Sequence, residues 1–118
     1  ACFLLGAEPV PGAVLVMRET GFDEALARAD LVLTAEGSVD AQSAAGKTVA
    51  RVASAARDAR TPCVILGGRV DDDVSALYAA GATAVLGIGR GARPIREALR
   101  CAGDDLAAAA EAVCRLSA

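Results

Sequence analysis

The sequence predicts an α/β fold, a three-layer parallel sheet of the Rossmann or flavodoxin-like kind that forms part of a domain. Three short apolar runs, over 31–34, 63–66 and 84–88, are each bounded by Gly, Pro or charged residues. Continuous runs of this length indicate strands that are covered on both faces, as in parallel sheets. Helical patterns alternate with them, which implies right-handed crossovers with helices on both faces. The composition, 54% hydrophobic but only 3% aromatic, suits a core in which helices pack closely on a sheet.

Helical spacing predicts two short helices before the first strand and a longer one after it. The first two cover 11–19 and 22–29 and are separated at Gly21. The third covers about 43–58, and Thr61-Pro62 follows it as a stop signal. Its apolar positions fall on one face, namely Val49, Val52, Ala53 and Ala56.

Two further helices complete the predicted order α-α-β-α-β-α-β-α. One follows the acidic run 71–73, which suits the positive end of a helix dipole, and Gly81 is its expected C-terminal cap. The last begins at Pro94, a residue favoured in a first helical turn. Its apolar face consists of Ile95, Leu99, Ala102, Leu106, Ala109, Val113 and Leu116.

Three strands make an incomplete sheet of this class. Doubly wound sheets usually have about five or six strands, and here both edge strands would be apolar and unpaired. The chain also begins with Ala-Cys-Phe-Leu-Leu, in what resembles the middle of an apolar helix. We therefore expect either a fragment of a longer protein or a chain that self-associates through its open sheet edges.

Charge and hydropathy predict a cytoplasmic protein with no nucleic-acid or membrane partner. The net charge is −3, and no basic stripe is present to neutralise phosphates along a nucleic acid. The longest apolar runs, 31–35 and 82–88, are far too short to span a bilayer. The start of the chain also lacks the pattern of a signal peptide.

The cysteine and histidine content narrows the possible chemistry. The chain has four cysteines, Cys2, Cys63, Cys101 and Cys114, and no histidine. Cys101 and Cys114 fall in one predicted helix, where they would be roughly 20 Å apart and unable to form a disulfide. We expect buried, reduced thiols. Without histidine, the Ser-His-Asp and Cys-His types of catalysis are excluded for this chain.

The ends of the three strands carry glycine and charge. In open parallel sheets, ligands bind beyond the carboxyl ends of the strands. Here the three strands are followed by 35–47, by 67–71 with Arg69, and by 89–93 with Arg90. Because all three segments would lie at one edge of the sheet, we favour an anion-binding site over three ordinary turns.

The segment after the first strand is the richest of the three. It supplies carboxylates, a lysine, hydroxyls and an amide at the mouth of a helix, from Glu36, Asp40, Lys47, Thr34, Ser38, Ser43 and Gln42. Phosphoryl transfer needs such groups: cations and backbone N–H groups for the phosphates, and a carboxylate for magnesium or the attacking hydroxyl. In the alternative interpretation, Asp40 or Ser43 merely caps the helix and Lys47 is a solvated surface residue.

Two nucleotide-binding motifs match only in part. The stretch Ala41-x4-Gly46-Lys47-Thr48 fits a relaxed Walker A pattern, but its first glycine is missing and six residues separate it from the strand. Gly87-x-Gly89-x-x-Ala92 matches a dinucleotide fingerprint, but no second strand with an acidic residue follows it. A small P-loop or nucleotide-binding module is therefore a third interpretation, which depends on these weak matches alone.

Residues 31–47 resemble the signature of the type I glycerate kinases, an apolar run followed by T-G-E-G-x-h-D-x-Q-T-x-x-G-K, where h is apolar. The likeness covers essentially all 118 residues in family order, from Phe3-Leu-Leu-Gly-Ala-Glu to the final helix. It implies a cytoplasmic, ATP- and Mg²⁺-dependent enzyme that phosphorylates D-glycerate to 2- or 3-phosphoglycerate. It also implies that residues 1–118 are the C-terminal α/β part of a longer protein whose N-terminal half is absent, and that this part alone is inactive.

The resemblance also identifies site residues, and their roles are our inference from their chemistry. Asp40, Glu36 and Lys47 are the predicted catalytic residues, with Asp40 as the metal ligand. Substrate or phosphate binding is expected from Thr34, Gly37, Gln42, Ser43 and Gly46 of the motif, and from Arg69, which follows the second strand. The sequence departs from the family pattern at Ala35, where the family has glycine, and at Ser43, where it has threonine. Ala35 leaves open a second function, that of a non-catalytic remnant or anion-binding domain, because a Cβ there is unfavourable if the backbone needs a positive φ or must approach the ligand closely.

Overall fold

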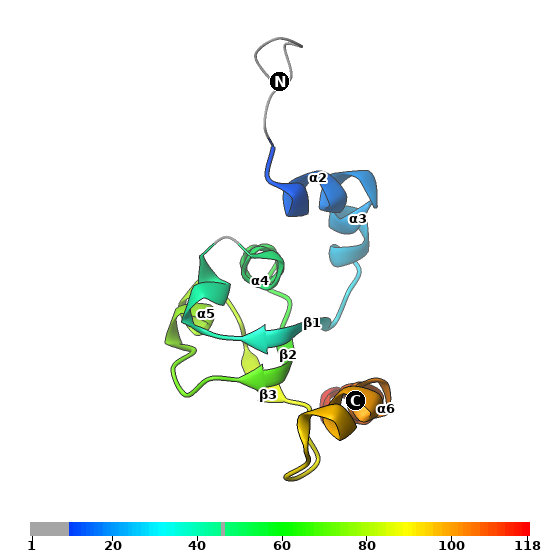
Figure 1. Ribbon diagram of the computed structural model, residues 1–118. Helices are drawn as coiled ribbons and strands as arrows, with labels where there is room; N and C mark the ends of the chain where they lie inside the picture. The colour runs from blue at the N-terminus through cyan, green and yellow to red at the C-terminus, as the bar shows by residue number, and fades with distance from the viewer. Residues whose placement is uncertain (1–9, 46) are drawn as a thin grey trace.

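A computed structural model describes residues 10–45 and 47–118, and contains a parallel sheet with the strand order β1-β2-β3 (Figure 1). The strands are β1 (Val32–Val39), β2 (Cys63–Val70) and β3 (Ala84–Gly87). The predicted α/β class and parallel three-stranded sheet are confirmed. The apolar start of the chain, with Cys2, and the predicted phosphate-binding Gly46 lie outside the described residues.

The helices follow the predicted order, with one 3-10 helix added. They are α2 (Gly12–Glu19), α3 (Phe22–Leu26), α4 (Thr48–Asp58), α5 (Ser75–Ala80) and α6 (Ile95–Ser117), and the 3-10 helix η1 (Ala41–Ala44) lies between β1 and α4. The single helix predicted over 43–58 is therefore wrong at its start. The chain leaves helical geometry at Ala45 (ψ 57°) and is extended at Lys47 (ψ 162°), which precedes α4.

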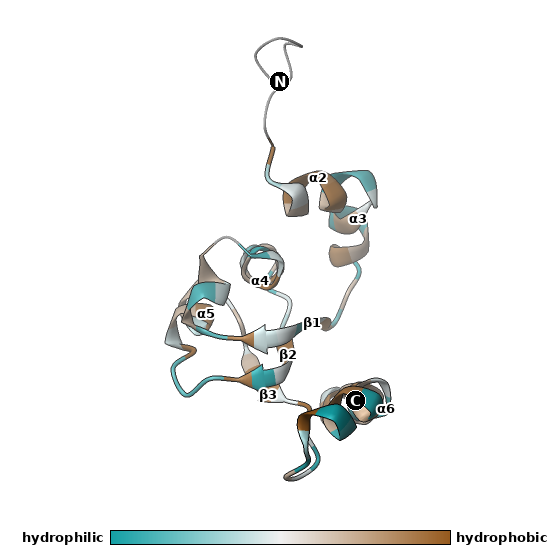
Figure 2. Cartoon of the chain, viewed as in Figure 1, coloured by the Kyte–Doolittle hydropathy of each residue, from teal (hydrophilic) through white to brown (hydrophobic). Residues whose placement is uncertain are grey.

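Strands β1 and β2 are four residues longer than predicted, because backbone pairing continues past the end of each apolar run. Glu36 pairs with Gly67, and Ser38 pairs with Arg69. Ladder hydrogen bonds use only main-chain groups, so polar side chains and glycine do not end them. Glu36 and its neighbours to residue 39 thus lie in a strand, and not in the loop that the sequence predicted. Figure 2 shows a single hydrophilic band near the carboxyl end of β2, followed by a hydrophobic tip.

The sheet has a core on each face. Cys63 and Ile65 of β2 belong to the larger core with α4 and α5, while Val64 and Leu66 pack against Val113 of α6. This alternation follows from the two-residue period of a strand. Figure 1 shows α6 on the opposite side of the sheet from α4 and α5. The prediction of helices on both faces is confirmed.

Helix α6 covers its face of the sheet only in part. Val113 is 6% exposed, whereas Leu99 is 70% and Ile95 is 72% exposed. Cys114, one position after Val113, points away from the sheet and is exposed, so the prediction of buried thiols is wrong there and holds fully for Cys63. Within the described residues, no helix is long and apolar enough to cross a membrane.

Candidate active site

Three charged side chains meet beside the second half of β1. Lys47 Nζ lies 3.6 Å from Glu36 Oε1 and 3.8 Å from Asp40 Oδ1. Glu36 lies in β1, Asp40 follows the end of that strand, and Lys47 stands immediately before α4. We call Glu36, Asp40 and Lys47 the Lys47 cluster. All three side chains are between 29% and 40% exposed, so they are accessible to a ligand from solvent.

Asp40 is fixed by Ser43, which is fully buried. The Ser43 N–H donates to Asp40 Oδ1 over 2.9 Å, and the Asp40 N–H donates to Ser43 Oγ over 3.1 Å. These two bonds form a capping box at the start of η1. The interpretation of Asp40 and Ser43 as a helix cap is therefore correct. Capping does not use the whole Asp40 carboxylate. Its second oxygen, Oδ2, takes part neither in these hydrogen bonds nor in the ion pair with Lys47.

The surroundings of Asp40 keep its carboxylate ionised. Burial by itself would raise its pKa, but the positive charge of Lys47 and hydrogen bonds from Ser43 and Gln42 together hold the pKa below its usual value. A proton acceptor works best when its pKa is near the working pH. The low pKa therefore suits Asp40 to holding a cation or orienting a hydroxyl, more than to removing a proton.

Glu36 has one carboxylate oxygen without a partner. Oε1 faces Lys47, whereas Oε2 is buried and accepts no hydrogen bond within the described part of the chain. A buried carboxylate oxygen left unsatisfied costs roughly 1–3 kcal/mol or more. A cation or a hydroxyl supplied by a ligand would satisfy Oε2.

Glu36 and Lys47 of the Lys47 cluster line a pocket of about 430 Å³ between β1 and the first turns of α2 and α4. We call it the Lys47 pocket. Among the described residues, no side chain caps either helix at its N-terminus, and the first N–H groups of a helix favour an anion. The pocket is lined by Pro11, Gly12, Ala13, Ala35, Glu36, Lys47, Thr48 and Val49. The contribution of α2 was missed from the sequence, although Pro11-Gly12 at the start of this helix was its signal.

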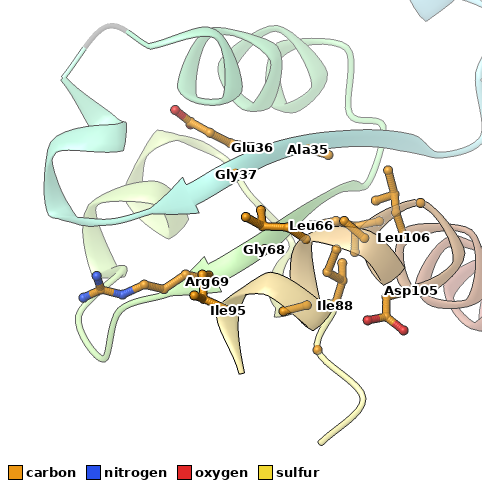
Figure 3. Close-up of a pocket in the computed structure, with 15 residues that line it drawn as sticks. Ala35, Glu36, Gly37, Leu66, Gly68, Arg69, Ile88, Ile95, Asp105 and Leu106 are labelled. Atoms are coloured by element: carbon orange, nitrogen blue, oxygen red, sulfur yellow. The ribbon is translucent and has the colours of Figure 1, made fainter. Parts of the chain in front are cut away.

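A second pocket, also about 430 Å³, lies on the other face of β1 against α6, and we call it the α6 groove. Figure 3 shows Leu66 and Ile88 on its sheet side and Ile95 and Leu106 on its α6 side. Its lining is mainly apolar. Ala35 and Glu36 line both pockets, so β1 forms a wall that the two share.

Comparison with known proteins shows the family to which the chain belongs. The model of the glycerate kinase family matches residues 1–118. The chain belongs to the glycerate kinase family. Relatives that carry the name glycerate kinase include one from Bacillus subtilis, 34% identical over 100 residues, and a glycerate 2-kinase from Escherichia coli, 32% identical over 102 residues. An uncharacterized protein of Mycobacterium bovis is 40% identical over 102 residues.

This member of the glycerate kinase family spans about a quarter of the length of those relatives. The matched region covers 85–86% of this chain but only 26–27% of each relative. Which part of the relatives it corresponds to stays a prediction.

The remaining residues of the predicted site lie outside the Lys47 cluster. Thr34 lies within β1 opposite Ile65, and in the described structure its side chain forms no hydrogen bond with the cluster. Gln42 is exposed in η1. Gly37 and Arg69 line the α6 groove, but Arg69 is bound to Asp71 over 2.8 Å. Figure 3 shows its guanidinium directed away from Leu66 and Ile88. Arg90 is exposed after β3.

The departure from the family motif at Ala35 causes no backbone strain. Ala35 lies in β1 and pairs with Leu66, and in the described chain the positive-φ residue other than glycine is Arg60. The concern that position 35 needs glycine for its conformation is therefore wrong. The extra Cβ only forms part of the wall between the two pockets.

Proposed function

We propose that this chain supplies part of an active site that transfers the γ-phosphoryl group of ATP to glycerate, giving phosphoglycerate. The observation that carries the proposal is the Lys47 cluster, in which one lysine contacts two carboxylates beside a pocket at two helix N-termini. Membership in the glycerate kinase family and the names of the relatives support the same reaction.

In this proposal Lys47 and the first turn of α4 neutralise a phosphate or the carboxylate of glycerate. The cluster itself carries two negative charges and one positive charge, from Glu36, Asp40 and Lys47. With a net negative charge, it would repel a polyphosphate unless a further cation is present. This balance favours a divalent metal, and Mg²⁺ with ATP is the expected cofactor pair.

The carboxylates fit a magnesium ion that is shared with phosphates. In the described residues no three acidic, cysteine or histidine side chains gather to hold a metal alone. Protein sites for Mg²⁺ commonly use one or two carboxylates together with substrate phosphates and water. Asp40 through Oδ2 and Glu36 through Oε2 would hold such an ion, which would neutralise charge on the phosphates.

Asp40 would also orient the glycerate hydroxyl that attacks the phosphorus. Its low pKa keeps it ionised, so it accepts a hydrogen bond from that hydroxyl. Phosphoryl transfer depends mainly on positioning and electrostatic stabilisation, and this role requires no strong base. Whether the 2- or the 3-hydroxyl is presented depends on how glycerate lies, and both products stay open.

The capping box favours one alternative, an anion-binding domain without catalysis. Asp40 and Ser43 have a structural task that would keep them in place in an inactive protein. The expectation that these 118 residues alone show no turnover stays a prediction. The cytoplasmic location predicted from the sequence stays a prediction.

The test is a transfer assay on the complete natural protein that carries these residues. D-glycerate and MgATP are supplied, and the product is identified by phosphorus NMR. We expect phosphoglycerate that forms only with Mg²⁺ present. The proposal is wrong if the protein binds ATP at the Lys47 pocket but no phosphorylated glycerate accumulates. That result would support the anion-binding alternative.

A further inference from the structure

We propose that the α6 groove receives the base and ribose of the nucleotide whose phosphates lie at the Lys47 cluster. The inference rests on the proposed function, because it assigns the nucleoside end of the same ligand. The groove is lined by residues of β1 and β2, of the segment after β3, and of the first three turns of α6. It is of ordinary size for a small-molecule site, for which about 300–1,000 Å³ is typical.

Three glycines in the groove are explained neither by backbone conformation nor by packing. Gly37, Gly89 and Gly103 all line it. None is among the described glycines with positive φ. A Cβ added at any of the three would meet no heavy atom within 4 Å. The chain itself therefore does not require glycine at these positions, whereas close approach of a ligand would.

Gly68, on the sheet side of the same groove, provides the contrast. A Cβ added there would lie 2.7 Å from the carbonyl oxygen of Gly37, so pairing of β1 with β2 accounts for that glycine. Gly103 is the most informative of the unexplained three, because it lies in the interior of α6. Glycine at such a position destabilises a helix by about 1 kcal/mol relative to alanine.

The chemistry of the groove fits a heteroaromatic base. Leu66, Ile88 and Leu99 provide apolar surface on two sides, and Leu99, which is 70% exposed, would be covered by the base. An ion pair of 2.9 Å between Arg93 and the buried Asp105 ties the segment after β3 to α6. The two walls of the groove are thereby held together before any ligand binds.

The position of the α6 groove favours a nucleotide, and not a protein segment, as its ligand. Ala35 and Glu36 are common to the groove and the Lys47 pocket, which lie on opposite faces of β1. In the described sheet β1 is an edge strand, so one ligand can reach both pockets by passing over the strand at Gly37, where no side chain intervenes. A ligand with an apolar ring at one end and phosphates at the other matches this pair of pockets.

The experiment fills the groove without weakening the fold. Gly103→Leu places a side chain in the groove and should stabilise α6, because leucine is a far better helix former than glycine. Ala107→Leu adds similar bulk to an exposed position of the same helix that does not line the groove. Both variants are made in the complete natural protein, and binding of ADP and of tripolyphosphate, each with Mg²⁺, is measured by calorimetry.

We expect Gly103→Leu to weaken ADP binding by about tenfold or more, which corresponds to about 1.4 kcal/mol. Tripolyphosphate binding should be unchanged, and Ala107→Leu should change neither ligand. The inference is overturned if Gly103→Leu binds ADP as the wild type does, if both ligands weaken equally, or if the wild type does not bind ADP. If a protein segment fills the groove instead, Gly103→Leu should bind ADP as the wild type does, and its unfolding temperature should be lower than that of the wild type. Because binding is measured without glycerate, failure of phosphoryl transfer is a separate outcome.

Discussion

Asp40 and Ser43 hold each other through reciprocal hydrogen bonds of 2.9 Å and 3.1 Å between the backbone of each and the side chain of the other. This pair ends β1, begins η1, and sets the direction of the Asp40 carboxylate toward Lys47. The structural and chemical interpretations of Asp40 are therefore compatible, because one oxygen serves the cap and the other is left for a ligand. They can be separated by substitutions that remove one task at a time.

Replacing Ser43 with alanine removes the cap but leaves the Asp40 charge. The free energy of unfolding should fall by about 1–2 kcal/mol, as expected for loss of an N-terminal capping interaction. Urea unfolding followed by circular dichroism measures this difference. Ser38→Ala is the matched control, since Ser38 is exposed in β1, and its unfolding should match the wild type. Equal stability of all three proteins would contradict the importance of the capping box.

Asp40→Asn has the opposite effect, because asparagine caps a helix about as well as aspartate but carries no charge. Turnover of the complete protein should fall by about 100-fold or more, the usual range for loss of a positioned catalytic group, with little loss of stability. Asp72→Asn, at an exposed position, should keep full activity. Steady-state rates with saturating MgATP are the measurement, and near-normal turnover in Asp40→Asn would refute the role of this carboxylate.

The lowered pKa of Asp40 predicts how its charge affects stability. A carboxyl group whose pKa is lower in the folded protein stabilises the fold above its unfolded pKa, near 3.8 here, and this contribution disappears as the pH falls through the folded pKa. The wild type should therefore exceed Asp40→Asn in unfolding free energy at pH 7, and the difference should vanish in acid. Asp73 also has a lowered pKa, but it is present in both proteins and drops out of the comparison. A difference in unfolding free energy between the two proteins that grows as the pH falls would contradict this prediction.

The ion pair between Arg93 and Asp105 predicts a strong contrast between two adjacent aspartates. Asp105 is buried and Asp104 is exposed. Asp105→Ala should lower the free energy of unfolding by about 3 kcal/mol, because it leaves the Arg93 charge largely buried without a partner. Asp104→Ala should have almost no effect. Thermal unfolding of both variants is the measurement, and equal effects would mean that the ion pair does not hold the end of α6.

The sequence predicted the order of the elements, because that order depends on local signals, whereas the roles of the charged residues stay a prediction. Apolar runs marked the strands, and the helical face with Val49, Val52 and Ala53 is buried as expected. The extension of β1 through Glu36 to Val39 was missed, since its cause is pairing with β2, a non-local contact that leaves no apolar pattern. The 3-10 turn before α4 was missed for a similar reason, because alanine-rich stretches such as 41–45 suit several helical forms.

The α6 groove could not be predicted from any single segment. It forms where three strand ends meet a helix that begins about 60 residues after β1 starts. Gly103, inside a helix otherwise rich in Ala and Leu, was the one local signal of an unusual surface. The exposure of Tyr78 and Cys114 likewise depends on how α5 and α6 are rotated on the sheet, which the helical period alone does not fix.

The account depends most on the claim that Lys47 is held by two carboxylates for a charged ligand, and not merely for stability. Lys47→Met in the complete protein tests it, with phosphoglycerate formation and unfolding temperature measured on the same preparation. Because this ion-paired lysine is 40% exposed, its loss should change stability little. Turnover should fall by about 100-fold or more, as for loss of one donor to a developing charge. A Lys47→Met protein that turns over like the wild type would contradict the account.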